Sequence, residues 1–314
     1  MNVYIKTTES CNFNCIHCYN LSDKSKLDFD KTKNFLVQLN QLYQNNVFIF
    51  HGGEPMIGDI DKMSSLMNDF QDTYWRVSTN LGYELTEKRK EILLKMDQVR
   101  VSFDVGIRFG NISNLIKWYK NIKWLTHNRD DVYINICLST FLLRHEPLQL
   151  LKMFDKLGIK QYAFERITQT GSAQKHQYII PSYQEIDRWL CKIYDLEVNK
   201  QVKCRCQDIL NVKLGIQNHP EQCYGKQCCR NSLTINSDGS IGNCPNDAKT
   251  NIIATTDDNA KYVIRQLYKK KHIPKKKCLT CKYYEHCHGG CEQQEWQNNV
   301  CPYPKQLADL IMEK

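Results

Sequence analysis

Short β-type runs alternate with helical patterns throughout the first 180 residues of the chain. The candidate strands cover residues 3–8, 47–50, 75–79, 99–104, 132–139 and 161–166. The intervals between them carry apolar residues at helical spacing, at 29–44, 61–71, 86–96, 112–125 and 147–158. This alternation is typical of parallel strands joined by right-handed crossovers. Because six such units are too few for a closed eight-strand barrel, the sequence predicts an α/β fold with a partial (β/α)6 TIM-like barrel.

The second part of the chain has a different character. A helical stretch at 181–198 leads into sequence whose periodicity weakens after residue 204 and in which cysteines crowd together. We expect three segments: the barrel at 1–180, a helical bridge at 181–222, and a small cysteine-rich domain with α/β-hairpin elements at 223–314. The last segment ends in a predicted helix at 303–314. A chain of 314 residues with 41% hydrophobic content can bury a sizeable core.

Sixteen of the residues are cysteines. The chain shows no signal peptide and no run of 18 apolar residues, so we expect a cytoplasmic protein with no membrane partner. The cytoplasm keeps thiols reduced, and a core of this size needs no disulfide staples. We therefore interpret the cysteines as metal ligands.

The formal charge of +9 counts every thiol as neutral. Eleven thiolates that held three [4Fe–4S] cores of about +2 each would lower the charge to about +4. This value does not call for a nucleic-acid partner, and we expect none. The basic run at 269–277 is either a solvated linker or a docking patch for an acidic electron donor or acidic peptide.

Three cysteines, Cys11, Cys15 and Cys18, form a C-x3-C-x2-C loop after the first predicted strand. Thiolates select zinc or iron–sulfur clusters. A structural zinc site is closed by a fourth side chain, whereas a catalytic metal centre keeps one position open. His17 lies between Cys15 and Cys18, where its ring is poorly placed to reach the same metal. The spacing therefore favours an open centre over structural zinc.

The loop resembles the cluster motif of the radical S-adenosylmethionine (SAM) enzymes. The resemblance implies that Cys11, Cys15 and Cys18 hold a [4Fe–4S] cluster whose fourth iron is chelated by the amino and carboxylate groups of SAM. It also implies that His17, at a position usually filled by an aromatic residue, packs near the adenine.

Further segments at the predicted strand ends resemble the SAM-binding segments of this family. They are "GGEP" (52–55), "TNLG" (79–82), "VSFD" (101–104) and "FERITQTGSA" (164–173). The resemblance implies SAM contacts by Gly52, Gly53, Glu54, Asn80, Ser102 and Arg166. For Arg166, a surface salt bridge is the alternative. Many relatives continue with a glycine and an HD-x-x-R helix start after "SFD", whereas this chain reads "VGIRFGNIS", which leaves Arg108 as a weak candidate for the arginine that binds the SAM carboxylate.

Two predicted strands carry polar residues on one face. Strand alternation places Arg100, Ser102 and Asp104 together on one face of the fourth strand. The polar face of the fifth strand comprises Tyr133, Asn135, Cys137 and Ser139. Both faces should line the barrel lumen. A lumen thiol could return a hydrogen atom to a substrate radical, as in radical peptide epimerases, so Cys137 and Asp104 are the candidate catalytic residues; simple packing is the alternative for Cys137.

The second group of cysteines resembles the SPASM extension of many radical SAM enzymes. Its spacing is C-x9-G-x4-C from Cys229 to Cys244, then C-x2-C-x5-C-x3-C from 278 to 291, then Cys301. Similarity to sulfatase-maturing relatives implies two auxiliary [4Fe–4S] clusters. One would be held by Cys223, Cys229, Cys244 and Cys291, and the other by Cys278, Cys281, Cys287 and Cys301. Cys228 is an alternative to Cys229, and two zinc ions are the alternative to the clusters.

The predicted function is therefore reductive cleavage of SAM to a 5′-deoxyadenosyl radical, which abstracts hydrogen from a peptide or protein side chain. The product would be a crosslink, an oxidation or an epimerised residue, and the electron would come from a flavodoxin- or ferredoxin-type reductant. One alternative is a radical SAM dehydrogenase or transferase acting on a small molecule. Another is a non-catalytic iron–sulfur or zinc binding module. Because the cluster motif begins at residue 11, we expect any leader-binding domain to be absent or separate.

Overall fold

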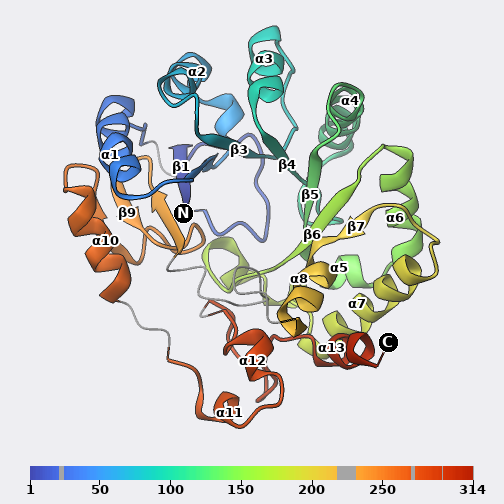
Figure 1. Cartoon of the computed structure of the whole chain (residues 1–314). Helices are drawn as coiled ribbons and strands as arrows, with labels where there is room; N and C mark the ends of the chain where they lie inside the picture. The colour runs from blue at the N-terminus through green and yellow to red at the C-terminus, as the bar shows by residue number, and fades with distance from the viewer. Residues whose placement is uncertain (21–24, 218–230, 270–272, 292, 314) are drawn as a thin grey trace.

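The computed structural model describes residues 1–20, 25–217, 231–269, 273–291 and 293–313. Its centre is one curved ten-stranded sheet in the order β10-β9-β8-β1-β2-β3-β4-β5-β6-β7 (Figure 1). The six central strands are β1 (Asn2–Thr8), β2 (Val47–Gly52), β3 (Tyr74–Thr79), β4 (Gln98–Ser102), β5 (Val132–Leu138) and β6 (Gln161–Arg166). Neighbours among them pair in parallel. The predicted fold class, a partial barrel of six βα units, is confirmed.

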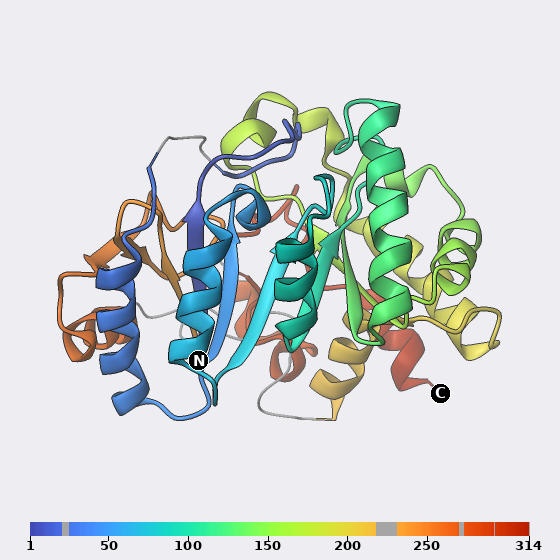
Figure 2. The same cartoon turned by 90° about the horizontal axis from the view of Figure 1, so that it is seen from above.

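Helices cover the outer face of the sheet (Figure 2). They are α1 (Phe29–Leu42), α2 (Ile60–Asp69), α3 (Glu87–Lys95), α4 (Ile112–Asn128), α5 (Thr140–Leu143), α6 (Pro147–Lys156) and α7 (Tyr183–Val198). Several start at side-chain caps: Asp28, Asp59 and Asn111 each accept hydrogen bonds from the first turn of α1, α2 and α4. Ser182 and Glu185 form a complete capping box on α7.

The hydrophobic core lies between these helices and the outward-facing residues of the strands. Phe50 of β2 stacks on Trp75 of β3 with ring centroids 4.8 Å apart. At the other end, Phe164 of β6 packs against Trp189 of α7 at 5.0 Å. Such aromatic pairs contribute about 0.5–1.5 kcal/mol beyond the area that they bury. The opposite face of the strands lines the lumen and carries mostly polar side chains, among them Arg76, Arg100 and Asn135.

The later part of the chain extends the same sheet at both ends. β7 (Arg205–Cys206) pairs with β6, and β8 (Ser232–Ile235) pairs in parallel with β1. β9 (Ser240–Gly242) and β10 (Ile252–Thr255) then form an antiparallel ribbon. The remaining helices are α8 (Gln207–Ile216), α10 (Ala260–Lys269), α11 (Lys276–Leu279), α12 (Tyr284–Cys287) and α13 (Lys305–Met312), with short 3-10 turns at Pro55–Ile57, Gly171–Lys175 and Gln177–Ile179. One sheet therefore contains strands from before residue 180 and from after residue 222. The division of the chain into three segments at these positions stays a prediction.

No helix in the described ranges is both long and apolar enough to pass through a bilayer.

The C-terminal helix is fixed to α7 by one carboxylate. Asp187 accepts hydrogen bonds from the backbone N–H groups of Gln306, at 2.8 Å, and Leu307, at 3.0 Å, at the start of α13. We expect Asp187→Ala to lower the free energy of unfolding by about 1–3 kcal/mol, because two buried donors lose their acceptor. Urea denaturation measures this. Asp61→Ala, which removes only an exposed ion pair with Lys88, is the control and should change stability by less than about 0.5 kcal/mol.

Candidate functional site

The first cysteine loop follows β1, at the edge where the carboxyl ends of the parallel strands meet. The backbone N–H of Phe13 donates to Cys11 Sγ at 3.4 Å, and the Asn80 side chain approaches the same sulfur at 3.6 Å. Cys15 is buried, and its Sγ lies 3.8 Å from the carbonyl oxygen of Arg108. Burial raises the pKa of the Cys15 thiol to about 12 and raises those of Cys11 and Cys18. A bound cation is therefore needed to hold the three as thiolates.

The spacing of these sulfurs differs from that of a single-ion site. In the described residues, only one group of three Cys, His, Asp or Glu side chains has ligand atoms within 4.8 Å of one another, and it is not this loop. A tetrahedral zinc ion with Zn–S bonds of about 2.3 Å holds its sulfurs about 3.8 Å apart. The three sulfurs of the loop are therefore not gathered as closely as one zinc ion would hold them.

The glycine pair after β2 is required by the cysteine loop itself. The φ angle of Gly52 is +128°, and a Cβ atom there would lie 2.1 Å from the carbonyl oxygen of Thr8. A Cβ on Gly53 would lie 2.2 Å from the carbonyl oxygen of Ser10. Gly53 N–H donates to Thr8 at 2.8 Å, and Glu54 N–H donates to Ser10 at 2.9 Å. The "GGEP" turn thus fixes the start of the cysteine loop against the edge of the sheet.

Glu54 turns its carboxylate into the protein and is 1% exposed. It accepts hydrogen bonds from Thr79 Oγ1 at 2.8 Å, from the Asn80 N–H at 2.5 Å and from the Met56 N–H at 3.1 Å. Asn80 in turn donates to Asn12 at 2.8 Å beside Cys11. The structure therefore brings together three of the predicted site residues, Glu54, Asn80 and Cys11. Burial outweighs these hydrogen bonds and raises the pKa of Glu54 to about 7.

This shift gives a pH-dependent prediction. Between its ordinary pKa and about 7, the unfolded chain releases the Glu54 proton while the folded chain keeps it. The free energy of unfolding should therefore fall as pH rises through this interval, by up to about 3 kcal/mol. Glu54→Gln cannot titrate, so its stability relative to the parent should improve by that amount from pH 5 to pH 7.5. Urea denaturation of the metal-free protein at both pH values measures this, and parallel pH curves for the two proteins would contradict it.

Asp104 lies just past the end of β4 and is 1% exposed. One carboxylate oxygen accepts the Cys137 N–H at 2.5 Å, and the other is paired with Arg108 and lies 3.5 Å from His17 Nε2. Burial alone would raise the pKa of Asp104, but Arg108 and then His17 bring it below its ordinary value. Burial lowers the pKa of His17 to about 4, so the ring is neutral. The predicted residues Asp104, Cys137 and His17 thus form one cluster, with their ligand atoms within 4.8 Å of one another.

Arg108 belongs to this cluster. Its guanidinium is ion-paired with Asp104 and lies 3.4 Å from His17 Nε2. A cation at this point argues against a metal ion bound by the cluster, because the two positive charges would repel each other. The Cys137 thiol is held protonated, since burial, Asp104 and Glu165 all raise its pKa.

Glu165 is the lumen residue that sequence analysis missed. Cys137 of β5 is the register partner of Glu165 of β6, and Asn135 donates to the Glu165 carboxylate at 2.8 Å. Ser102 of β4 is the register partner of Asn135, so the three strands present a continuous polar row. The alternation that was applied to the fourth and fifth strands would have identified Glu165 if it had been extended to residues 161–166.

Arg166 lies on the other side of β6 from Glu165. It lines one cavity with Tyr183, Gln294 and other residues, and a second cavity with Asp208 and Cys291. The structure therefore places Arg166 next to the C-terminal cysteine segment. Its predicted contact with SAM stays a prediction.

The predicted auxiliary ligands divide into two groups. Cys278, Cys281, Cys287 and Cys301 all line a single cavity of about 150 Å³. Cys291 lines a different cavity, of about 210 Å³. Cys223, Cys229 and the alternative ligand Cys228 lie outside the described residues. Cys204 and Cys206 are buried beside β7 and direct their sulfurs to the Leu151 carbonyl and to Asp208, which is consistent with packing.

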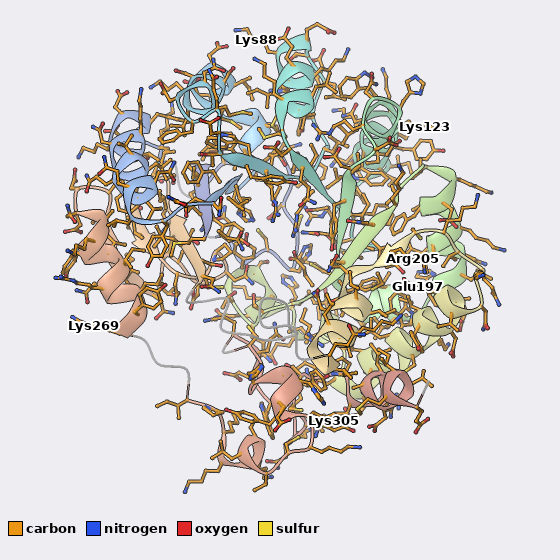
Figure 3. All side chains as sticks on the ribbon, viewed as in Figure 1. Lys88, Lys123, Glu197, Arg205, Lys269 and Lys305 are labelled. Atoms are coloured by element: carbon orange, nitrogen blue, oxygen red, sulfur yellow. The ribbon has the colours of Figure 1, made fainter. Side chains whose placement is uncertain are left out.

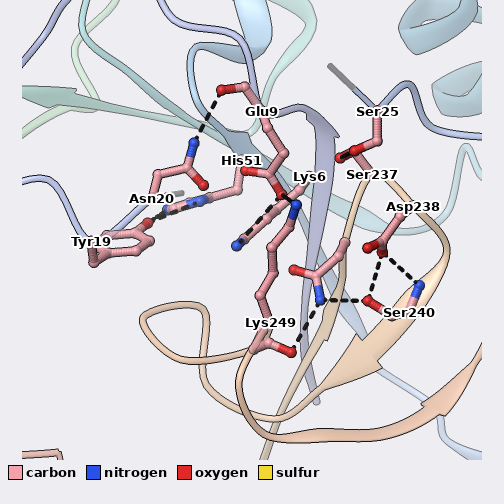
Figure 4. A network of polar contacts seen from close by, with 12 residues as sticks. Lys6, Glu9, Tyr19, Asn20, Ser25, His51, Ser237, Asp238, Ser240 and Lys249 are labelled. Atoms are coloured by element: carbon pink, nitrogen blue, oxygen red, sulfur yellow. Dashed lines mark hydrogen bonds and ion pairs between the residues drawn. The ribbon is translucent and has the colours of Figure 1, made fainter. Parts of the chain in front are cut away.

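A larger cavity, of about 490 Å³, opens between the first cysteine loop and residues 245–250. Tyr19, the 3-10 turn at Gly171–Lys175 and the turn from Pro245 to Thr250 line it. At its inner end, Glu9 lies 3.8 Å from Lys6 Nζ and 3.3 Å from Lys249 Nζ (Figure 4). This buried ion-pair network ties the C-terminal region to β1.

Known proteins resemble this chain in sequence and in fold. Residues 3–115 match the family model described as a 4Fe-4S single cluster domain. The cysteine-type anaerobic sulfatase-maturating enzyme of Clostridium novyi (strain NT) is 23% identical over 341 residues, which cover 95% of this chain and 89% of that enzyme. Among solved structures, anSMEcpe with bound AdoMet superimposes with a TM-score of 0.79 at 18% identity, covering 99% of this chain and 96% of that one. These matches bear out the predicted resemblance to radical SAM enzymes in sequence and in fold.

A second solved relative supports the same placement. Streptococcus suis SuiB bound to precursor peptide SuiA superimposes on this chain with a TM-score of 0.68 at 14% identity, covering 93% of this chain and 72% of that one. The predicted family resemblance is thus confirmed. The individual cluster ligands and SAM contacts stay predictions.

Proposed function

We propose that this chain is a radical SAM enzyme that modifies a peptide or protein side chain by hydrogen-atom abstraction. The observation that carries the proposal is the cavity of about 490 Å³ beside the first cysteine loop, which is large enough for a peptide segment. The backbone carbonyl of Cys18 accepts a hydrogen bond from the cavity residue Ser172, at 2.8 Å, so the cavity adjoins the loop directly. Both anSMEcpe and SuiB have been solved with a bound peptide, which supports a substrate of this class.

The proposed cofactors are SAM and three [4Fe–4S] clusters. Cys11, Cys15 and Cys18 would hold the SAM-binding cluster, and the four thiols of the 150 Å³ cavity would hold one auxiliary cluster. Cys223, Cys229, Cys244 and Cys291 would hold the other. When bound together, this cluster and SAM would supply the one-electron chemistry needed for hydrogen-atom abstraction. Gly52, Gly53, Glu54, Asn80, Ser102 and Arg166 remain the proposed SAM contacts, with His17 near the adenine.

The lumen residues would orient the substrate and supply hydrogen. The Cys137 thiol is protonated and faces the lumen beside Glu165, as a hydrogen-atom donor must. Asp104 would act as a positioning residue, because it binds the Cys137 backbone and fixes Arg108 next to His17. Return of a hydrogen atom to a substrate carbon gives epimerisation, whereas loss of a further electron and proton gives oxidation or a crosslink.

Anaerobic reconstitution tests the proposal. The protein should bind about twelve irons and absorb visible light, and with SAM and dithionite it should release 5′-deoxyadenosine. Zinc without visible absorption would instead indicate a non-catalytic binding module. Deuterium transfer from a labelled peptide into 5′-deoxyadenosine would identify the substrate class. Transfer only from labelled small molecules would contradict the peptide proposal.

A further inference from the structure

The four-thiol cavity lies at the periphery of the molecule. Its walls come from α11, α12 and the segment before α13, which project away from the central sheet (Figure 1). Cys278 and Cys287 are buried, while Cys281 and Cys301 are half-buried, so the cavity lies directly beneath the surface. We propose that this face is the docking surface for an acidic protein that delivers single electrons. The inference rests on the proposed function, which places an iron–sulfur cluster in the cavity.

Five exposed lysines lie on the segments that form the cavity, and this set is called the lysine rim: Lys275, Lys276, Lys277, Lys282 and Lys305. Lys277 and Lys305 line the cavity, and no acidic side chain of the described residues does so. Lys275 Nζ lies 4.9 Å from the centre of the Trp296 ring, which also lines the cavity. These contacts hold the cations beside the opening. Figure 3 shows Lys305 at this outer edge of the fold.

One rim charge is balanced within the protein. Lys282 is paired with Asp309 at 2.8 Å, and Asp309 also accepts a hydrogen bond from Tyr283 at 2.7 Å. Glu285 and Glu295 are exposed on the same segments. The four other rim lysines still outnumber these two carboxylates at the surface, and the bound cluster with its four thiolates, of net charge about −2, would lie beneath them. A net positive rim attracts an acidic protein and accelerates its encounter.

Two exposed apolar side chains next to the rim lysines in the sequence favour a protein over a small ion. Leu279 in α11 is 61% exposed, and Ile273, shortly before α11, is 83% exposed. A protein interface typically combines such an apolar centre with a charged border. The cavity volume of about 150 Å³, lined by four thiols, leaves no room for a peptide once a cluster is bound, so the partner contacts only the rim. An electron carrier needs nothing more than this close approach.

The test uses the reconstituted protein and a purified acidic flavodoxin as the probe. In the rim variant, Lys275→Glu, Lys276→Glu and Lys305→Glu are combined. The control variant combines Lys117→Glu, Lys120→Glu and Lys123→Glu, which make the same charge change on exposed positions of α4, across the molecule (Figure 3). Thermophoresis at low and high salt gives the dissociation constant for oxidised flavodoxin. We expect at least about 10-fold weaker binding for the rim variant only, with a smaller salt dependence.

A second readout separates this inference from the proposed function. The rate of 5′-deoxyadenosine release should fall in the rim variant when flavodoxin is the reductant, and should be unchanged with dithionite. Equal weakening of flavodoxin binding in both variants, or in neither, would overturn the docking surface. Loss of the dithionite-driven rate in the rim variant would also overturn it, because the lysines would then serve the cluster itself.

An oligoglutamate peptide that binds the rim as tightly as flavodoxin would favour a peptide site instead. If the parent protein releases no 5′-deoxyadenosine with dithionite, the proposed function fails, while the binding measurement remains readable.

Discussion

Cys15→Ala should reduce 5′-deoxyadenosine release by more than about 100-fold. Cys15 is the buried member of the first cysteine loop, and its sulfur lies 3.8 Å from the Arg108 carbonyl oxygen. Loss of a residue that merely orients a metal ligand lowers metal affinity or activity about 10- to 100-fold. Loss of the ligand itself should therefore lower it further. The measurement is 5′-deoxyadenosine release with SAM and dithionite after anaerobic reconstitution, together with iron content, which should fall from about twelve to about eight.

Two further cysteine variants serve as controls for this result. Cys191 is half-buried on α7, so Cys191→Ala should keep both the full iron content and the rate. Cys301 lines the four-thiol cavity, so Cys301→Ala should also lose about four irons but keep the absorbance of the cluster on the first loop. If Cys15→Ala retained the rate while Cys301→Ala abolished it, the assignment of the SAM-binding cluster to the first loop would be wrong.

The six central strands could be predicted because their signals are local. Each combines a β-branched or aromatic run with an adjoining helix, and several of these helices start at a capping residue, such as Asp28 or Ser182. Two strand ends differ from the prediction by two residues: the second strand continues to Gly52, and the fourth, expected to reach Asp104, ends at Ser102. The chain leaves the ladder there because the Asp104 carboxylate turns inward to Arg108 and the Cys137 backbone. No local pattern encodes that contact.

The strands at the sheet edges could not be predicted for a related reason. β7 has only two residues, and it is held by long-range hydrogen bonds, in which Glu197 accepts the Cys206 N–H at 2.6 Å and Asp155 accepts the Cys204 N–H at 2.9 Å. β8 pairs with β1 from more than two hundred residues away in the sequence. Pairing at that distance is decided by tertiary packing, which the short run "SLTI" does not reveal.

The site shows the same division between local and distant signals. The resemblance to the SPASM extension predicted a ligand set shared by Cys278, Cys281, Cys287 and Cys301, and their side chains do line one cavity. Short loops of this kind leave the sulfurs little freedom to separate. Glu165 and the contact between Arg108 and His17 depend instead on how strands and loops meet. Arg108 was a weak candidate for the SAM carboxylate, yet its guanidinium is already engaged by Asp104, which is visible only once the fold is known.

The Asp104–Arg108 pair should therefore dominate the stability of the lumen. Asp104→Asn keeps an acceptor for the Cys137 N–H but leaves the buried guanidinium without its counter-charge. Breaking a buried pair by removing one partner costs about 3–5 kcal/mol, so we expect a loss of that order in the free energy of unfolding of the metal-free protein. Arg108→Met should also destabilise the fold, since it leaves the carboxylate buried. The double variant should be more stable than the sum of the two single changes by at least about 2 kcal/mol, because neither orphaned charge remains.

Acid sensitivity distinguishes this ion pair from ordinary packing. The folded pKa of Asp104 is below its ordinary value of about 3.9, so its stabilising contribution is present above that value and is lost as pH falls through the folded pKa. Asp104→Asn lacks this contribution, and the stability difference between it and the parent should therefore shrink as the pH is lowered towards 3. Guanidinium denaturation between pH 7 and pH 3 measures the trend. A difference that stayed constant over this range would show that Asp104 acts through its shape and hydrogen bonds rather than its charge.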